Sequence, residues 1–226
     1  AEFMWLSGIT ICDGMAADFA ECKEHIVPAH PFSDDIISVS RKLAERFCCD
    51  TEHIHQVEIA ALKLFDALRK ANHLTKKDRL LLQIAAILHN CGSFLNLNDI
   101  GENSYKIVTS TEIIGLSHQE RMIVAYVIRY TTGDFPEYSE IKNEFSREEY
   151  IKIAKLNAIL CLADAMDRSH QQKFTNFTVR KRGYDLTITG QTLYDITLEH
   201  GMFIQKSPFF EEAFGIRPVL RQKKCL

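Results

Sequence analysis

Four polar residues of this chain have the side chains that a divalent metal site needs, namely His53, His89, Asn90 and Asp164. Imidazole nitrogens and carboxylate oxygens both bind divalent ions, and such ions assist phosphate chemistry. Asn90 stands directly after the second histidine, where a carboxylate would add negative charge, and its neutral amide adds none. The set therefore predicts a degenerate site that binds Mg²⁺ or Mn²⁺ only weakly.

Each of these residues lies on a segment whose pattern predicts a helix. Thr51 is placed to cap a helix in which His53 shares one stripe with apolar residues at steps of three or four. Thr75 with Asp78 resembles a capping box and opens an apolar run that ends at residues 89–92. Gly92 is suited to the position that follows a helix end.

Three further helix starts are indicated by serine residues. Ser33 can cap an amphipathic segment, and Ser117 with Glu120 and Ser146 with Glu149 form capping boxes. In the last of these helices Asp164 falls on the apolar face, so its helix carries it inward. We therefore expect all four polar residues to lie in one buried cluster.

Convergence of these residues leaves two alternatives open. Buried polar side chains carry a desolvation penalty unless they meet one another or a ligand. A metal ion can satisfy His53, His89 and Asp164. Alternatively, Asp164 accepts a hydrogen bond from either imidazole and Asn90 completes a polar cluster without metal.

After His170 the sequence pattern changes from helical periodicity to short runs typical of β-strands. Two short runs rich in β-branched and aromatic residues, 174–179 and 186–189, predict a small C-terminal β ribbon with a turn at 180–183. An amphipathic stretch at 193–214 and a basic tail follow. Basic residues near the ribbon predict an anion-binding surface, or else a solvated turn: Arg168, Lys173, Arg180, Lys181 and Arg182.

Composition excludes several classes of protein. With 46% hydrophobic and 25% charged residues in 226, the chain is typical of a globular protein with a sizeable core. Its net charge of −3 gives no overall attraction to nucleic acid or to an anionic membrane. No apolar run reaches the ~18–20 residues of a membrane span. Seven cysteines without paired CxxC spacing predict reduced thiols in a cytoplasmic protein.

The N-terminal residues differ from the rest of the chain. Residues 1–3 precede Met4 and are interpreted as a cloning scar. Within residues 4–32, Pro28 and Pro31 oppose a regular helix and indicate a linker. We expect one mostly α domain at 33–226.

With these features described, residues 33 to the end resemble the C-terminal part of the exopolyphosphatase and guanosine pentaphosphate phosphohydrolase (Ppx/GppA) family. The similar stretches are 53–57, 64–66, 85–89, 115–121, 129–130, 162–169, 198–199 and 210–215. Residues 5–21, which include the stretch 6–15, resemble the last segment of that family's N-terminal phosphatase domain.

The resemblance implies an HD-type helical domain with a small β ribbon. It implies that a missing N-terminal, actin-like domain binds Mg²⁺ and carries the phosphohydrolase site. It also implies that the helical domain contributes to homodimer formation and to a channel that holds polyphosphate.

The chain departs from the family pattern at three places. The HD pair reads His89-Asn90, a histidine-rich stretch of the family is 100–104 here, and a histidine and an arginine are replaced by Thr131 and Thr132. The leading interpretation is therefore a binding and dimerisation module with no catalysis by itself. The alternatives are a metal-dependent phosphohydrolase that uses His53, His89 and Asp164, and a regulatory module that binds a guanosine polyphosphate.

Overall fold

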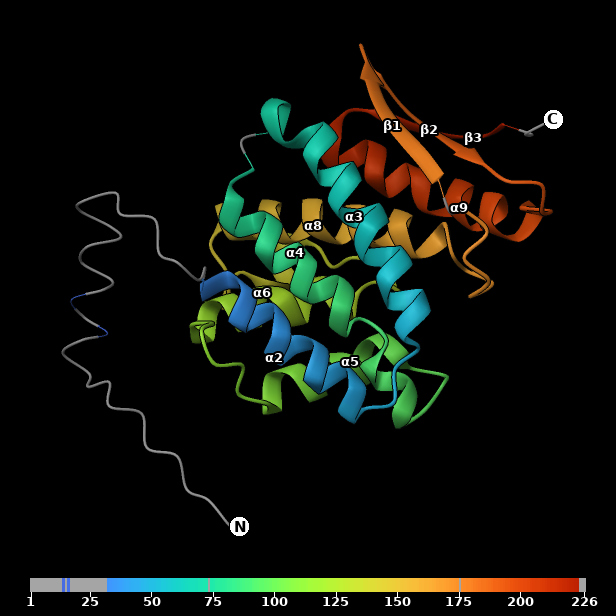
Figure 1. Cartoon of the computed structure of the whole chain (residues 1–226). Helices are drawn as coiled ribbons and strands as arrows, with labels where there is room; N and C mark the ends of the chain where they lie inside the picture. The colour runs from blue at the N-terminus through green and yellow to red at the C-terminus, as the bar shows by residue number, and fades with distance from the viewer. Residues whose placement is uncertain (1–13, 15, 17–31, 73, 175, 224–226) are drawn as a thin grey trace.

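The computed structural model describes residues 14, 16, 32–72, 74–174 and 176–223. The predicted cloning scar at residues 1–3 lies outside the described residues. So does the segment 4–32, predicted to be the end of a phosphatase domain and a linker, except for residues 14, 16 and 32. Figure 1 shows the helices gathered into one body, with a small sheet at one edge.

Helices dominate the described chain, which confirms the mostly α fold class with a small C-terminal β part. In chain order they are α2 (Phe32–Arg46), α3 (Thr51–Asn72), α4 (Lys76–Leu88), the 3₁₀ helix η1 (Cys91–Phe94), α5 (Ile100–Ser110), α6 (His118–Arg129), α7 (Tyr138–Ile141), α8 (Arg147–Ala165) and α9 (Thr197–Phe214).

The predicted helix starts are largely confirmed. Reciprocal capping boxes open α4, α6 and α8, at Thr75 with Asp78, Ser117 with Glu120 and Ser146 with Glu149. The other two predicted caps are wrong. Ser33 lies inside α2. At the start of α3 the Asp50 carboxylate, rather than Thr51, accepts a hydrogen bond from the His53 backbone N–H at 3.2 Å.

Gly92 does not follow the end of α4 in a left-handed conformation, so that prediction is wrong. His89 caps α4 with right-handed dihedral angles, and Gly92 lies within η1. A β-carbon at Gly92 would collide with the backbone of Ile100 and Ser104, so glycine allows η1 to lie directly on α5. The Ser104 hydroxyl accepts from the Gly92 N–H at 2.7 Å and donates to the His89 carbonyl at 2.9 Å.

Within the described residues the sheet contains three strands, β1 (Asn176–Arg182), β2 (Asp185–Gln191) and β3 (Arg217–Lys223). β1 and β2 form the predicted hairpin, with Thr178 opposite Thr189, and β3 lies parallel to β2. The turn lies later than predicted, because Gly183 adopts a positive φ of 58° and residues 180–182 belong to β1. The basic tail was not predicted to form a strand. It does so because its alternate residues Pro218 and Leu220 are buried.

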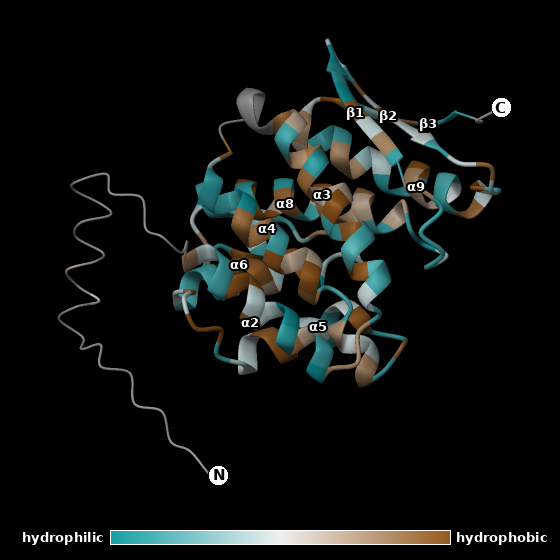
Figure 2. Cartoon of the chain, in the orientation of Figure 1, coloured by the Kyte–Doolittle hydropathy of each residue, from teal (hydrophilic) through white to brown (hydrophobic). Residues whose placement is uncertain are grey.

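The core lies where α3, α4, α6 and α8 pack together. Val57, Leu82 and Leu160 have no exposed surface, and Figure 2 shows apolar residues concentrated on these central helices. α9 packs against α8 and also against β3, while α3 contacts β1. None of the described helices has the length and apolarity to span a membrane.

Candidate functional site

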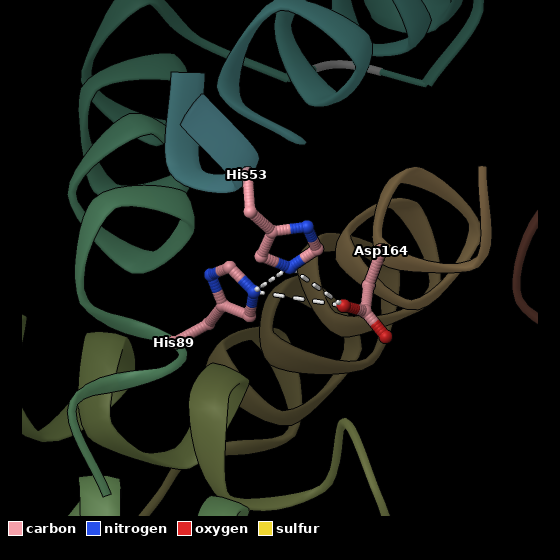
Figure 3. A group of neighbouring side chains, drawn as sticks. All are labelled: His53, His89 and Asp164. Atoms are coloured by element: carbon pink, nitrogen blue, oxygen red, sulfur yellow. Dashed lines mark hydrogen bonds and ion pairs between the residues drawn. The ribbon is translucent and has the colours of Figure 1, made fainter. Parts of the chain in front are cut away.

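His53, His89 and Asp164 come together from three helices. His53 lies in the first turn of α3, His89 follows the end of α4, and Asp164 lies near the end of α8. Figure 3 shows the three side chains pointing toward one another. The His53 Nε2 lies 3.2 Å from the His89 Nε2 and 3.4 Å from the Asp164 Oδ1, and the His89 Nε2 lies 3.6 Å from the same oxygen.

A second carboxylate fixes the orientation of His53. Its Nδ1 lies 2.9 Å from the Asp167 Oδ2, and both side chains are 1% exposed. Asp167 also accepts from the Gln172 backbone N–H and side-chain amide at 2.7 and 3.1 Å. An ionised carboxylate only accepts hydrogen bonds, so the His53 Nδ1 carries a proton.

The orientation of His89 is fixed by the backbone of its own helix. Its Nδ1 lies 2.7 Å from the Ala86 carbonyl oxygen. A carbonyl oxygen has no proton to give, so the His89 Nδ1 must also be the donor. Outer hydrogen bonds of this kind set the tautomer of histidines that bind metals through Nε2.

These two bonds create a conflict that a cation resolves. With both Nδ1 atoms protonated, neutral rings direct the two Nε2 lone pairs at each other across 3.2 Å, beside the Asp164 carboxylate. Either a proton on one Nε2 or a metal ion between them removes the repulsion. Metal bonds of about 2.0–2.2 Å place neighbouring ligand atoms about 2.8–3.6 Å apart, so His53, His89 and Asp164 fit a divalent ion.

Protonation of His53 is strongly favoured when no metal is bound. Burial lowers the pKa of His53, but hydrogen bonds and charges from Asp164 and Asp167 outweigh burial and raise it to about 9. Burial opposes ionisation of Asp164, but the two histidines hold its pKa well below the ordinary value. A metal ion bound at these residues would therefore have to displace this proton.

Arg168 lies beside Asp164 and extends the cluster toward solvent. Its guanidinium lies 3.6 Å from the second oxygen of Asp164, one helical turn away. The cluster lines a pocket of about 230 Å³, and the other residues that line it are Asn90, Ser93, Leu97, Ile100, Thr131, Thr132, Arg168 and His170. Asn90 thus lies at the same pocket as the three predicted ligands, although none of the described hydrogen bonds joins its side chain to them.

The five predicted anion-binding residues do not lie together. Arg168 lines the pocket of the cluster. Lys173 is directed inward, where its ammonium donates to the buried carboxylate of Glu199 at 3.1 Å. Arg180 and Arg182 extend from the solvent-facing side of β1. Lys181 lies between them, and strand alternation sends its side chain to the opposite side.

Neither Asp167 nor His170 was predicted from the sequence as a site residue. Asp167 lies three residues after Asp164 and within the stretch 162–169 that resembles the Ppx/GppA family, so the spacing and the resemblance were both available signals. The His170 ring stacks on the His53 ring, with centroids 3.6 Å apart and an interplanar angle of 8°, and its Nδ1 contacts Asp50 at 2.9 Å. His170 has a positive φ of 54° outside any helix, so no periodicity indicated this position.

Comparison with known proteins gives one finding that bears on this site. A family model described as Ppx/GppA phosphatase, domain III, matches residues 37–206. The match includes the three helices that carry His53, His89 and Asp164 and also the β1–β2 hairpin. No curated protein matches the chain.

The raised pKa of His53 predicts how the stability of the metal-free chain depends on pH. Because the folded pKa of about 9 exceeds the ordinary value of 6.5, this contribution to the free energy of unfolding is fully present below pH 6.5. This contribution is on the order of 3 kcal/mol; it decreases as pH rises above 6.5 and is lost above pH 9. Urea unfolding in the presence of a chelator, repeated from pH 6 to 10, measures the free energy of unfolding at each pH. His53→Gln should flatten this fall, whereas the control His55→Gln, at an exposed site on the same helix, should retain it.

The amide of Asn90 predicts that an added carboxylate strengthens metal binding. We expect Asn90→Asp to bind Mn²⁺ about 10-fold more tightly than wild type in isothermal titration, because a negative charge is added at the pocket. Asp164→Asn should lose most of the binding. Asn98→Asp makes the same chemical change at an exposed loop position and should leave the affinity unchanged. Equal affinities for the variants at 90 and 98 would contradict the prediction.

Proposed function

The chain belongs to the Ppx/GppA phosphatase family, in which it corresponds to domain III, and from this premise we propose that it is the phosphate-binding helical module of an exopolyphosphatase-like phosphatase. The module binds polyphosphate or a guanosine polyphosphate, contributes to homodimer formation and holds a divalent ion weakly. It works beside an N-terminal phosphatase domain and performs no catalysis by itself.

The observation that carries the proposal is that Arg168 and the cluster of His53, His89 and Asp164 line the same pocket. A guanidinium presents a fixed fork of donors that suits phosphate oxygens. A divalent ion, when bound, would neutralise phosphate charge as a Lewis acid. Thr131 and Thr132 line the same pocket and offer hydroxyl groups, although the Thr131 hydroxyl already donates to the Ile128 carbonyl at 2.8 Å.

The solvent-facing side of the sheet supports binding of a longer polyanion. Strand alternation places five basic residues on it, from β1 and β3: Arg180, Arg182, Arg217, Arg221 and Lys223. Asp185 is the acidic strand residue on this side, and it pairs with Arg217 at 3.0 Å. Among the described residues, Arg180, Arg182, Arg221 and Lys223 have no ion-pair partner, so this side carries a concentrated positive charge.

The residues on the solvent-facing side of the sheet suit linear polyphosphate better than single-stranded nucleic acid. The pocket between Arg180, Arg182 and Arg221 is lined otherwise by Thr187 and Thr189, whose hydroxyls can donate to phosphate oxygens. Single-stranded nucleic acid is usually held by stacking of its bases on aromatic side chains. The strand residues on this side include none, so the surface matches a linear polyphosphate better than an RNA or DNA strand.

We propose no catalysis by this chain alone because the cluster has too little negative charge to hold a catalytic metal ion tightly. Phosphoryl transfer depends on positioned positive charge and on an activated nucleophile. Asp164 alone among the three metal ligands is anionic, and Asn90 adds no charge to hold the ion. The facing Nε2 lone pairs do favour a second candidate, a metal-dependent phosphohydrolase built on His53, His89 and Asp164, and an activity assay decides between the two.

We expect the purified chain to release no phosphate from polyphosphate or from guanosine pentaphosphate, with Mg²⁺ or Mn²⁺ present. A phosphate-release assay with both substrates measures this, and Asn90→Asp provides the variant most able to gain activity. Sustained release by the wild-type chain, abolished in His89→Ala, would instead establish the hydrolase.

We expect medium-chain polyphosphate to bind, and the affinity to fall as ionic strength rises, because exposed charges are screened over about 8 Å at physiological salt. The triple variant Arg180→Ala/Arg182→Ala/Arg221→Ala should bind at least ~10-fold more weakly at low salt. The control Lys76→Ala/Lys142→Ala/Arg147→Ala removes the same charge from exposed positions in α4, directly after α7 and at the start of α8, respectively. Equal loss in both variants would mean that the sheet has no specific role.

A further inference from the structure

Two buried cysteines touch each other near the ends of the segments that carry His53 and His89. The sulfur atoms of Cys49 and Cys91 lie 3.4 Å apart, and the residues are 7% and 0% exposed. Both are free thiols. The sequence predicted reduced thiols and gave no sign of this pair, because 41 residues separate the two positions.

Each cysteine is joined directly to a segment that positions one histidine. Cys49 precedes Asp50, whose carboxylate caps α3 at the His53 N–H and also contacts the His170 ring. Cys91 follows Asn90 and opens η1, which is bonded to the His89 carbonyl through Ser104. A bond between the two sulfurs would therefore connect the start of α3 to the end of α4.

We propose that Cys49 and Cys91 form a reversible disulfide that changes the spacing of His53 and His89. The sulfur atoms must approach from 3.4 Å to about 2.05 Å, so the two backbone segments must move toward each other or rotate. The cluster has Nε2 atoms only 3.2 Å apart, so a shift of this size changes how well it holds a cation. The second half of this inference rests on the proposed metal binding.

Hydrogen peroxide is small enough to serve as the oxidant at a nearly buried thiol. The Cys49 sulfur attacks one peroxide oxygen, the O–O bond breaks, and a sulfenic acid and water result. The Cys91 sulfur then attacks the Cys49 sulfur, the S–O bond breaks, and the second water leaves with the Cys91 proton. Two thiols lose two electrons in total and one peroxide becomes two waters.

Two features make Cys49, rather than Cys91, the thiol of the pair that reacts first. Its hydrogen bond with Cys91 lowers the pKa of the Cys49 thiol, although burial opposes this. It retains some exposure, whereas Cys91 has none. Cys48 beside it has a positive φ of 49°, which turns the chain so that Cys48 faces solvent while Cys49 faces the core. Cys91 is then in contact as the resolving thiol.

The first test is chemical and needs no metal. The metal-free chain is treated with peroxide, remaining thiols are blocked, and digested peptides are analysed by mass spectrometry. We expect a Cys49–Cys91 cross-linked peptide that disappears after treatment with a reductant. Cys48→Ser should still form it, and Cys49→Ser or Cys91→Ala should not. Oxidation of Cys48 without any Cys49–Cys91 cross-link would overturn the proposal.

The second test measures the effect on the cluster. In NMR spectra of the metal-free chain, the His53 and His89 ring signals should shift between the reduced and oxidised forms, and those of exposed His55 should not. Mn²⁺ affinity should change about 10-fold, the scale expected when the supports of ligands are altered. Unshifted ring signals in the cross-linked chain would overturn the coupling to the histidines. A cross-linked chain with shifted signals that binds no Mn²⁺ in either state would leave the disulfide established and refute the proposed metal binding instead.

Discussion

The candidate site depends on one constraint, that both histidines have their Nδ1 protons committed elsewhere. Asp167 accepts the proton of His53 and the Ala86 carbonyl accepts that of His89. Each ring therefore directs an unshared electron pair at the other, and the site requires a positive charge between them. The surrounding structure maintains this arrangement, because Asp50 anchors the start of α3 and Ser104 holds the end of α4 against η1.

The charges around the cluster explain why this requirement can be met in two ways. Asp164 and Asp167 are two carboxylates beside two imidazoles, and a protonated His53 compensates part of their charge. A divalent ion would supply more positive charge than the proton and would displace it. Asn90 contributes no further negative charge, so the balance favours the proton more than an aspartate there would. A neutral residue at position 90 thus favours a protonated His53 over a bound metal ion.

The features that could be predicted from sequence are those set by local patterning. Capping boxes and apolar stripes located α4, α6 and α8, and the stripes carried His53 and Asp164 inward. What could not be predicted depends on distant contacts. Gly92 was predicted to follow a helix end. In the structure, its missing side chain allows η1 to lie directly on α5. β3 forms because β2 offers a parallel edge, and a basic tail alone does not indicate that.

The short segment after α8 joins the two proposed phosphate-binding surfaces. It leads from Arg168, at the pocket of the cluster, to β1, and buried acids hold it at several points. Asp167 accepts from Gln172, and Glu199, which is 0% exposed, accepts from both Ser169 and Lys173. Lys173, which was predicted to contact anions, pairs with the buried Glu199 carboxylate, and an unpaired buried charge would be strongly destabilising. The position of Arg168 relative to the sheet is therefore set by the Lys173–Glu199 ion pair and by hydrogen bonds to the Asp167 and Glu199 carboxylates.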